Sequence, residues 1–341
     1  MTVMIGIDPH KASHTAVAVD ELEEVMAEFK VRACRSQVER LREWAAPFSD
    51  RVWAIESARG LGYLLSHQLV AAGEVVVDVP AMLSTRARLL GSGRAQKNDP
   101  NDARSVAIVA LRNPDLHQVG RDDHARVLKL LVKRHRDLGR LKNQTACRLH
   151  ALLMEVVPGG MAASMTVTRA NTLLDTIEAD DQITAHRVEV ARDLVDDIAR
   201  YDRQLAASKR RLTTAVQASG TTLVDIVGVG PVTAAMMIGQ TGDVTRFPTA
   251  GHYASYNATA PIEVSSGSRH RHRLNPRGNR QLNWAIHVIA ICQLRNPGPG
   301  RDYYDRKRAE GKSTKEALRA LKRQVSNVVY RAMLTDARHA H

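Results

Sequence analysis

The chain has 341 residues, with 49 Lys and Arg against 36 Asp and Glu, and a formal net charge of +13. Its hydrophobic content of 44% is enough for globular cores and excludes a wholly disordered chain. No apolar run approaches the roughly 18 residues that cross a bilayer, and no cationic signal segment is present, so we expect a cytoplasmic protein without a membrane partner. Three separated cysteines exclude a disulfide framework, and we expect each to be a small buried residue: Cys34, Cys147 and Cys292.

Positive charge is concentrated towards the C-terminal end. Residues 261–341 contain 17 Lys and Arg against 6 Asp and Glu, a net charge of +11, whereas residues 1–260 contain 32 against 30. Such an asymmetry indicates a part of the chain that binds a polyanion, with nucleic acid the leading partner. The alternative is a solvated surface that keeps the protein soluble.

The first region, residues 1–125, has the pattern of an α/β domain. Short apolar runs end in an acidic residue, and helical spacing lies between them. The expected strands are Val3–Asp8 and Thr15–Val19, which form a hairpin, then Val52–Glu56 and Glu74–Pro80, with helices at Gln37–Trp44 and Gly62–Ala71.

The second region, residues 126–218, is predicted to consist of long helices. One helix is expected from Arg126 to Glu155, and one face of it carries a basic stripe that could follow a phosphate backbone. A merely solvated face explains that stripe equally well. The stripe consists of Arg126, Lys129, Lys133, Arg136 and Arg140. A second helix, from Ile183 to Val216, has a heptad-like apolar pattern and could be a dimer strut or a spacer.

The third region, residues 219–341, is predicted to be mostly helical. The segment Ile226–Ala235 has the form of a helix-hairpin-helix, in which Gly228 and Gly230 allow a tight turn. Backbone N–H groups at the start of the following helix could hold a phosphate. An ordinary turn between helices is the alternative.

Four acidic residues could hold a metal ion. Asp8 and Glu56 each end a predicted strand, and Asp99 and Asp102 share a face if a helix begins there. Oxygen ligands from several elements suit Mg²⁺, which can assist phosphoryl transfer. Each acid alone is more simply a surface residue, and Asp102 could cap the following helix.

These motifs resemble those of the DEDD transposases of the insertion sequence 110 family, the RNA-guided type that uses a bridge RNA. The N-terminal matches are Ile5–Lys11 (IGIDPHK), Ala54–Ser57 (AIES) and Lys97–Ala103 (KNDPNDA). The C-terminal matches are Val227–Pro231 (VGVGP), Ala260–Gly267 (APIEVSSG) and Gly278–Asn283 (GNRQLN). The resemblance runs in order along nearly the whole chain and rests on two independent sets of motifs.

The resemblance implies a RuvC-like domain of the RNase H fold, with the four DEDD acids at Asp8, Glu56, Asp99 and Asp102. It also implies a C-terminal transposase domain with a nucleophilic serine, here Ser266, or else Ser265. A structured non-coding RNA would guide recombination between donor and target DNA. The protein would act as a dimer or tetramer, with domains from different subunits completing each active site. Such a protein would be associated with the bacterial nucleoid.

Arginines follow the candidate serine closely, and their forked guanidinium groups match phosphate geometry. We expect them to hold a strand near the serine: Arg269, Arg271, Arg273, Arg277 and Arg280. Two other functions compete with a serine recombinase. One is a metal-dependent nuclease or Holliday-junction resolvase that uses water as its nucleophile, and the other is a nucleic-acid-binding protein without activity.

Overall fold

The computed structural model describes residues 2–91, 98–120, 123–161, 165–266, 269–273, 275–276 and 278–339. The chain forms two compact units, Met1–Asp122 and Asp123–His341, which we call the N-terminal and C-terminal units. The predicted division into three domains, 1–125, 126–218 and 219–341, remains a prediction about which parts fold independently. Within the described ranges, no helix combines the length and apolar character that a bilayer crossing requires.

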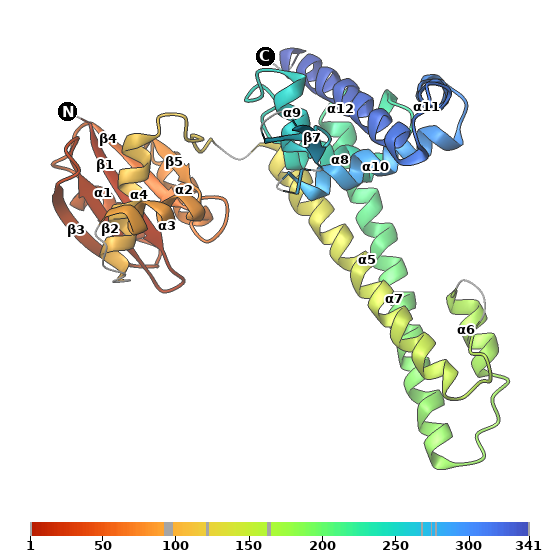
Figure 1. The fold of residues 1–341 in the computed structure, drawn as a ribbon. Coiled ribbons are helices and arrows are strands. Elements are labelled where there is room, and N and C mark those ends of the chain that lie inside the picture. Colours follow the sequence, from red (N-terminus) through yellow and green to blue (C-terminus); the bar gives the residue numbers. More distant parts are fainter. Residues whose placement is uncertain are drawn as a thin grey trace. The chain divides into compact units, whose positions relative to one another are not determined.

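The N-terminal unit is built on a five-stranded sheet in the order β3-β2-β1-β4-β5 (Figure 1). β1 is antiparallel to β2 and parallel to β4, and β3 is antiparallel to β2. This order and these directions are those of the RNase H fold to which RuvC-like domains belong. The strands are β1 (Val3–Pro9), β2 (Ser13–Val19), β3 (Val25–Arg32), β4 (Arg51–Glu56) and β5 (Val76–Val79).

The predicted strands and the first hairpin are confirmed, but β3 was not predicted. Most residues of β3 are exposed or half-buried, and Val31 is the one that is fully buried. An edge strand of this kind gives little apolar signal in the sequence, because one side of it faces solvent.

Helices cover both faces of the sheet. α1 (Gln37–Trp44) and α2 (Tyr63–Ala71) pack with Ile5, Ile7 and Trp53 on one face. α3 (Ala81–Gly91) and α4 (Asp99–Arg112) pack on the other face, where α4 contributes Ala103 and Ala107. Alternate residues of β1 therefore enter two different cores, and Asp8 shares the α4 face with Met4 and Gly6.

In the C-terminal unit, two long helices lie side by side (Figure 1). They are α5 (His124–Met154) and α7 (Gln182–Ala218), close to the predicted bounds, and Asp123 and Asp181 cap their N-termini. The helices are antiparallel, because the start of α5 and the end of α7 share one core while their other ends share a second with α6 (Val167–Leu174). The apolar seam of α7 therefore packs against α5 of the same chain.

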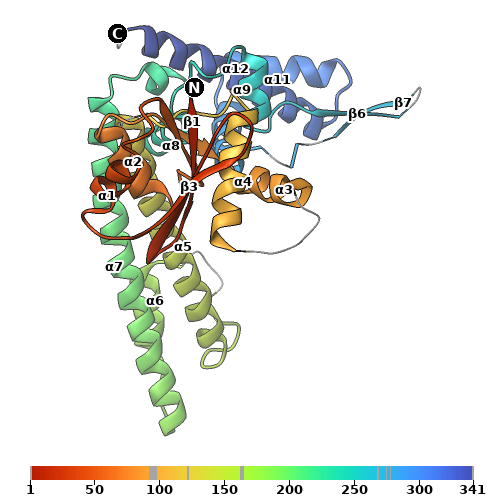
Figure 2. The same cartoon turned by 90° about the vertical axis from the view of Figure 1, so that its left-hand side faces the viewer.

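The remaining helices of this unit surround a core that includes the buried Tyr253. They are α8 (Pro231–Thr241), α9 (Ala250–Tyr256), α10 (Arg280–Arg295), α11 (Pro299–Ala309) and α12 (Thr314–His339). A four-residue 3-10 turn, η1 (Thr222–Asp225), stands where the first helix of the predicted helix-hairpin-helix would be. β6 (Ile262–Ser266) and β7 (Arg269–Arg273) form a narrow ribbon that extends away from these helices in Figure 2.

The cysteines differ from expectation. Cys34 and Cys147 are exposed, and Cys292 is half-buried beside Gly228. The prediction that all three are buried was therefore wrong, because two of them occupy solvent-facing positions rather than sites in an apolar core.

Candidate active site

Asp8 lies at the end of β1, where α4 crosses the strand. A Cβ built on Gly6 would stand 2.0 Å from the carbonyl oxygen of Ala103 and 2.5 Å from the backbone nitrogen of Ala107. Only glycine therefore allows α4 to approach β1 this closely. Asp8 is two residues further along the same face, so its carboxylate points towards the start of α4. The residue is 6% exposed.

Glu56 ends the neighbouring strand. β1 and β4 are parallel with Ile7 opposite Ile55, and continuing this register by one residue places Glu56 beside Asp8. β4 stops here because Ser57 takes a left-handed backbone conformation, with φ of 51°. The hydroxyl of the buried Ser84, on α3, donates a hydrogen bond to Oε1 of Glu56 and holds this carboxylate in place.

Asp99 and Asp102 occupy the first turn of α4. The helix is capped by Asn98, whose side chain accepts a hydrogen bond from the backbone N–H of Asn101 at 2.9 Å. Asp102 is therefore not the N-cap, which removes the capping role considered from the sequence. Both carboxylates stand at the positive end of the α4 dipole, which stabilises negative charge there.

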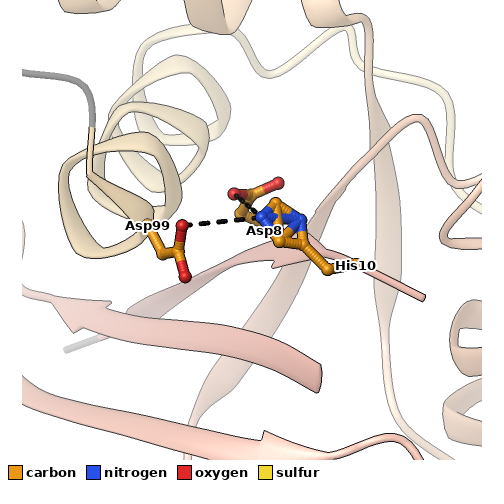
Figure 3. A group of neighbouring side chains, drawn as sticks. All are labelled: Asp8, His10 and Asp99. Carbon is orange, nitrogen blue, oxygen red and sulfur yellow. Dashed lines mark ion pairs between the residues drawn. The ribbon is translucent and has the colours of Figure 1, made fainter. Parts of the chain in front are cut away.

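Two basic side chains lie among the acids, and sequence reasoning assigned neither a role. Nε2 of His10 is 3.6 Å from Asp8 Oδ2 and 3.5 Å from Asp99 Oδ1, so the ring lies between the two carboxylates (Figure 3). Nζ of Lys30 donates to Asp99 Oδ2 at 2.9 Å. Thr15 pairs with both Asp8 and Lys30, so one row across β1, β2 and β3 carries the acid and the lysine.

Burial and neighbouring charges shift the pKa values of two acids in this site. Burial, reinforced by Glu56, Asp102 and Asp99, raises the pKa of Asp8 to about 6, although His10 opposes the rise. The hydrogen bond from Lys30 lowers the pKa of Asp99 instead. Glu56, Asp99 and Asp102 are therefore all near enough to Asp8 to act on its charge.

The cluster fits a divalent metal ion. Oxygen ligands of Asp8 and Asp99 and a nitrogen of His10 lie within 4.8 Å of one another, close enough to share one ion. A buried carboxylate that resists ionisation is stabilised when a cation binds, and hard oxygen donors suit Mg²⁺ and similar ions. The divalent metal is therefore consistent with the donor set that this chain presents.

The predicted basic stripe lies along α5, but its members have different surroundings. Lys133 and Arg140 are well exposed and both pair with Asp137, which lies between them. Arg136 donates to Gln281 at 2.6 Å and lies over the ring of Trp284, so it contacts α10. Arg126 and Lys129 are half-buried near α8, where Gly239 abuts the backbone of Lys129. The stripe is thus a partly neutralised surface.

The two predicted glycines of the turn before α8 also differ. Gly228 has φ of +89°, and a Cβ there would lie 3.0 Å from the carbonyl oxygen of Ile289 on α10. Gly230 has open space around it, and its N–H donates to the hydroxyl of Thr233 at 2.9 Å. The close packing of α10 and the positive φ therefore explain the glycine at position 228 without a bound phosphate.

The candidate serines end β6. Ser265 pairs with His270 and Ser266 pairs with Arg269. Because cross-strand partners share a face and residues alternate along a strand, the Ser266 position shares its face with those of Arg271 and Arg273. Arg280 begins α10, and Arg277 lies outside the described residues.

Comparisons with known proteins agree with these features. A transposase family model for the DEDD transposases of the IS110 type matches residues 5–158, and a model described as the transposase IS116/IS110/IS902 family matches residues 220–305. A protein of insertion element IS116 from Streptomyces clavuligerus is 29% identical, with 98% of this chain and 95% of that protein aligned. A protein of IS110 from Streptomyces coelicolor is 28% identical over 98% and 94% of the two chains.

Among solved structures, RuvC from T. thermophilus in complex with a Holliday-junction substrate is 20% identical, with a TM-score of 0.28, and the match covers 35% of this chain and 100% of that one. The two family models describe the N-terminal and C-terminal parts of one family and match this chain in order. The chain therefore belongs to the IS116/IS110/IS902 family of insertion-sequence transposases, enzymes that cut and rejoin DNA.

Proposed function

We propose that this transposase recombines DNA strands through Ser266, with Mg²⁺ held by Asp8, Glu56, Asp99 and Asp102, under the guidance of a structured non-coding RNA. The observation that supports the metal part is the buried carboxylate of Asp8, whose pKa is raised to about 6 by burial and further by the nearby Glu56, Asp102 and Asp99. A homo-oligomer, dimer or tetramer, would present the acids and the serine to donor and target strands.

The chain's own residues would prepare the metal site. Ser84 orients Glu56, and the N-terminal turn of α4 presents Asp99 and Asp102. Mg²⁺, when bound, would polarise the scissile phosphate and stabilise the charge of the transition state. Lys30, which pairs with Asp99, would then be free to contact a phosphate oxygen.

The serine chemistry conserves the phosphodiester bond energy. Ser266 Oγ attacks the phosphorus and loses its proton, a phosphoserine ester forms, and the P–O bond to the departing sugar oxygen breaks as that oxygen gains a proton. A hydroxyl of another strand then attacks the phosphoserine, which releases Ser266. The register of β6 and β7 supports Ser266 over Ser265, because Ser266 pairs with Arg269 and arginines match phosphate geometry.

A covalent-adduct assay tests this proposal. With DNA labelled beside the cut site, we expect Ser265→Ala to retain a protein–DNA adduct and Ser266→Ala to lose both the adduct and strand exchange. If only Ser265→Ala removes the adduct, the nucleophile is one residue earlier. If cleavage persists in both variants without an adduct, the metal-dependent nuclease that uses water is the correct function.

RNA guidance is supported by the excess of positive charge after residue 260. The experiment is to purify the protein from cells and sequence the nucleic acid that remains bound. One discrete RNA from the flank of the element is the expected result. A random sample of cellular RNA would contradict guidance while leaving the serine chemistry untouched.

A further inference from the structure

A basic cleft in the C-terminal unit lies outside the acidic cluster. It has a volume of about 1280 Å³ and lies between α10, α12 and residues 258–261. The last of these residues, Pro261, directly precedes β6, the strand that ends in Ser266. The cleft is therefore at the base of the ribbon that carries the candidate nucleophile.

Charge in the described lining of the cleft is strongly one-sided. Its six cations are Arg280, Lys312, Lys315, Arg319, Lys322 and Arg323. Its one acid, Glu316, already accepts hydrogen bonds from the backbone and hydroxyl of Ser313 at the start of α12. Cations about one helical turn apart on α12 form a row of the kind that follows a polyanionic strand.

Lys322 is the most informative member of this set. Burial lowers its pKa, and no nearby carboxylate opposes the effect within the part of the chain that the structure describes. Its Nζ donates to Asn283 Oδ1 at 2.7 Å. The amide nitrogen of Asn283 is itself fixed by the carbonyls of Asn257 and Ala258, so the lysine is held in one place. An ammonium group has three donors, which leaves capacity for an anion.

An aromatic ring completes the cleft. Trp284 lines it and is 45% exposed, and the guanidinium of Arg136 lies 5.6 Å from the ring centroid. Large exposed aromatics beside a basic groove are typical of sites where an unpaired base stacks. A paired duplex would offer phosphates to the lysines but no free base to the tryptophan.

We propose that this cleft binds the sugar–phosphate backbone of an unpaired nucleic-acid segment, with Lys322 on a phosphate and Trp284 against a base. The inference rests on the proposed function only in that the segment bound would lead towards Ser266. The shared chemistry is a phosphodiester strand, whether DNA or RNA, and the test separates these sources.

The test measures binding of the full-length protein to labelled single-stranded DNA, RNA of the same sequence and the duplex DNA, over a range of salt. We expect Lys322→Met to weaken binding of an unpaired strand about tenfold. It should also reduce the slope of log K against log salt by about 0.7, the loss of one single-strand phosphate contact. Lys209→Met, which removes the same charge from an exposed site on α7, should change neither quantity.

Two further variants keep the test independent of folding. Lys315 and Arg319 are exposed, so Lys315→Gln with Arg319→Gln should weaken binding without unfolding the protein. Trp284→Leu should reduce binding of the unpaired strands more than binding of the duplex. The stronger of the two unpaired probes identifies DNA or RNA as the occupant.

The proposal is overturned if Lys322→Met and the paired substitution both behave like Lys209→Met, if duplex binds best and Trp284→Leu has no effect, or if poly-glutamate competes as well as the strands do. Ser266→Ala separates the two proposals, since it should retain full binding affinity while losing the adduct. If Lys322→Met loses strand binding but still forms the adduct, the serine reaction does not require this cleft. That result would leave the proposed role of Ser266 unchanged.

Discussion

Gly6 and Ala103 are in direct backbone contact: a Cβ built on Gly6 would lie 2.0 Å from the carbonyl oxygen of Ala103. This contact fixes how closely α4 crosses β1. Because Asp99 and Asp102 begin α4 and Asp8 ends β1, the geometry of the acidic cluster depends on a residue that has no side chain.

The first prediction concerns that contact. Gly6→Ala should destabilise the N-terminal unit by about 2–4 kcal/mol, because backbone atoms of α4 must move away from the strand. It should also weaken Mn²⁺ binding, measured by calorimetry, since Asp99 moves with α4. Gly120→Ala is the matched control, because a Cβ there meets nothing within 4 Å. Equal melting temperatures for the two variants would show that α4 is not held by this contact.

The second prediction concerns pH. The pKa of Asp8 is raised from 3.8 to about 6 in the folded protein, so the folded state keeps a proton that the unfolded state has lost between these values. Stability contributed by this residue is therefore highest below pH 3.8, falls as the pH rises to about 6 and stays lower above it.

Asp8→Asn abolishes that penalty and should stabilise the unit by about 1–2 kcal/mol at pH 7 without divalent cations, allowing for partial screening of the charge. The stability difference from the native protein should disappear near pH 4. Added Mg²⁺ should raise the melting temperature of the native protein and not that of Asp8→Asn. Asp115→Asn, at an exposed position, is the control. A less stable Asp8→Asn at pH 7 would contradict the crowding of charge.

The third prediction concerns Lys30. Its ammonium group competes with a metal ion for Asp99, so Lys30→Met should strengthen Mn²⁺ binding several-fold. The pKa of Asp99 should rise towards its ordinary value, because the hydrogen bond from Lys30 is the main cause of its depression. NMR titration of the carboxylate measures the pKa. The stability change should be under about 1 kcal/mol, since the ion pair is exposed.

Arg35→Met, an exposed charge in the turn before α1, controls for the loss of one positive charge. Weaker metal binding in Lys30→Met than in Arg35→Met would indicate that the lysine supports the site instead of competing for it.

The fourth prediction separates packing from phosphate binding at the turn before α8. Gly228→Ala should destabilise the C-terminal unit by about 1–3 kcal/mol, because φ is +89° and Ile289 is too close. Gly230→Ala, with ordinary φ and open space, should leave the melting temperature nearly unchanged. Nucleic-acid affinity, normalised to folded protein, should be alike in both variants. A specific loss of affinity in Gly230→Ala would instead favour a phosphate at this turn.

The long helices could be predicted from the sequence to within a few residues. The expected helix Arg126–Glu155 is α5, His124–Met154, and Ile183–Val216 is α7, Gln182–Ala218. Apolar residues that keep helical spacing over many turns give a strong signal for a helix. The helix that packs against α7 could not be predicted. A heptad pattern indicates that the apolar face of a helix is buried, but it does not identify the helix that buries it.

The acidic cluster was predictable for a different reason. Parallel strands that end in acids bring them to one edge, which places Asp8 beside Glu56. The basic residues could not be predicted in this way. Lys30 is separated from Asp99 by 69 positions in the sequence, and it lies on β3, a strand with little apolar pattern. A sequence signal for His10 did exist, because it follows Asp8 by only two residues. In the structure it lies in the turn after β1, where its backbone N–H donates to the carbonyl oxygen of Ser13.

The α5–α7 pair holds two separate cores. One includes Leu128 and Leu212, the other Leu149 and Val195, and α7 has no buried residue between Ile198 and Leu212 in its fully described length. On α5, Leu138 and Thr145 are buried over this stretch. We expect the far end of the pair, with α6, to open as its own cooperative unit while the helices around Tyr253 stay folded. Amide protons of α6 should exchange through this local opening, long before those of α8 or α12, and changes to the far end should leave the remainder of the C-terminal unit intact.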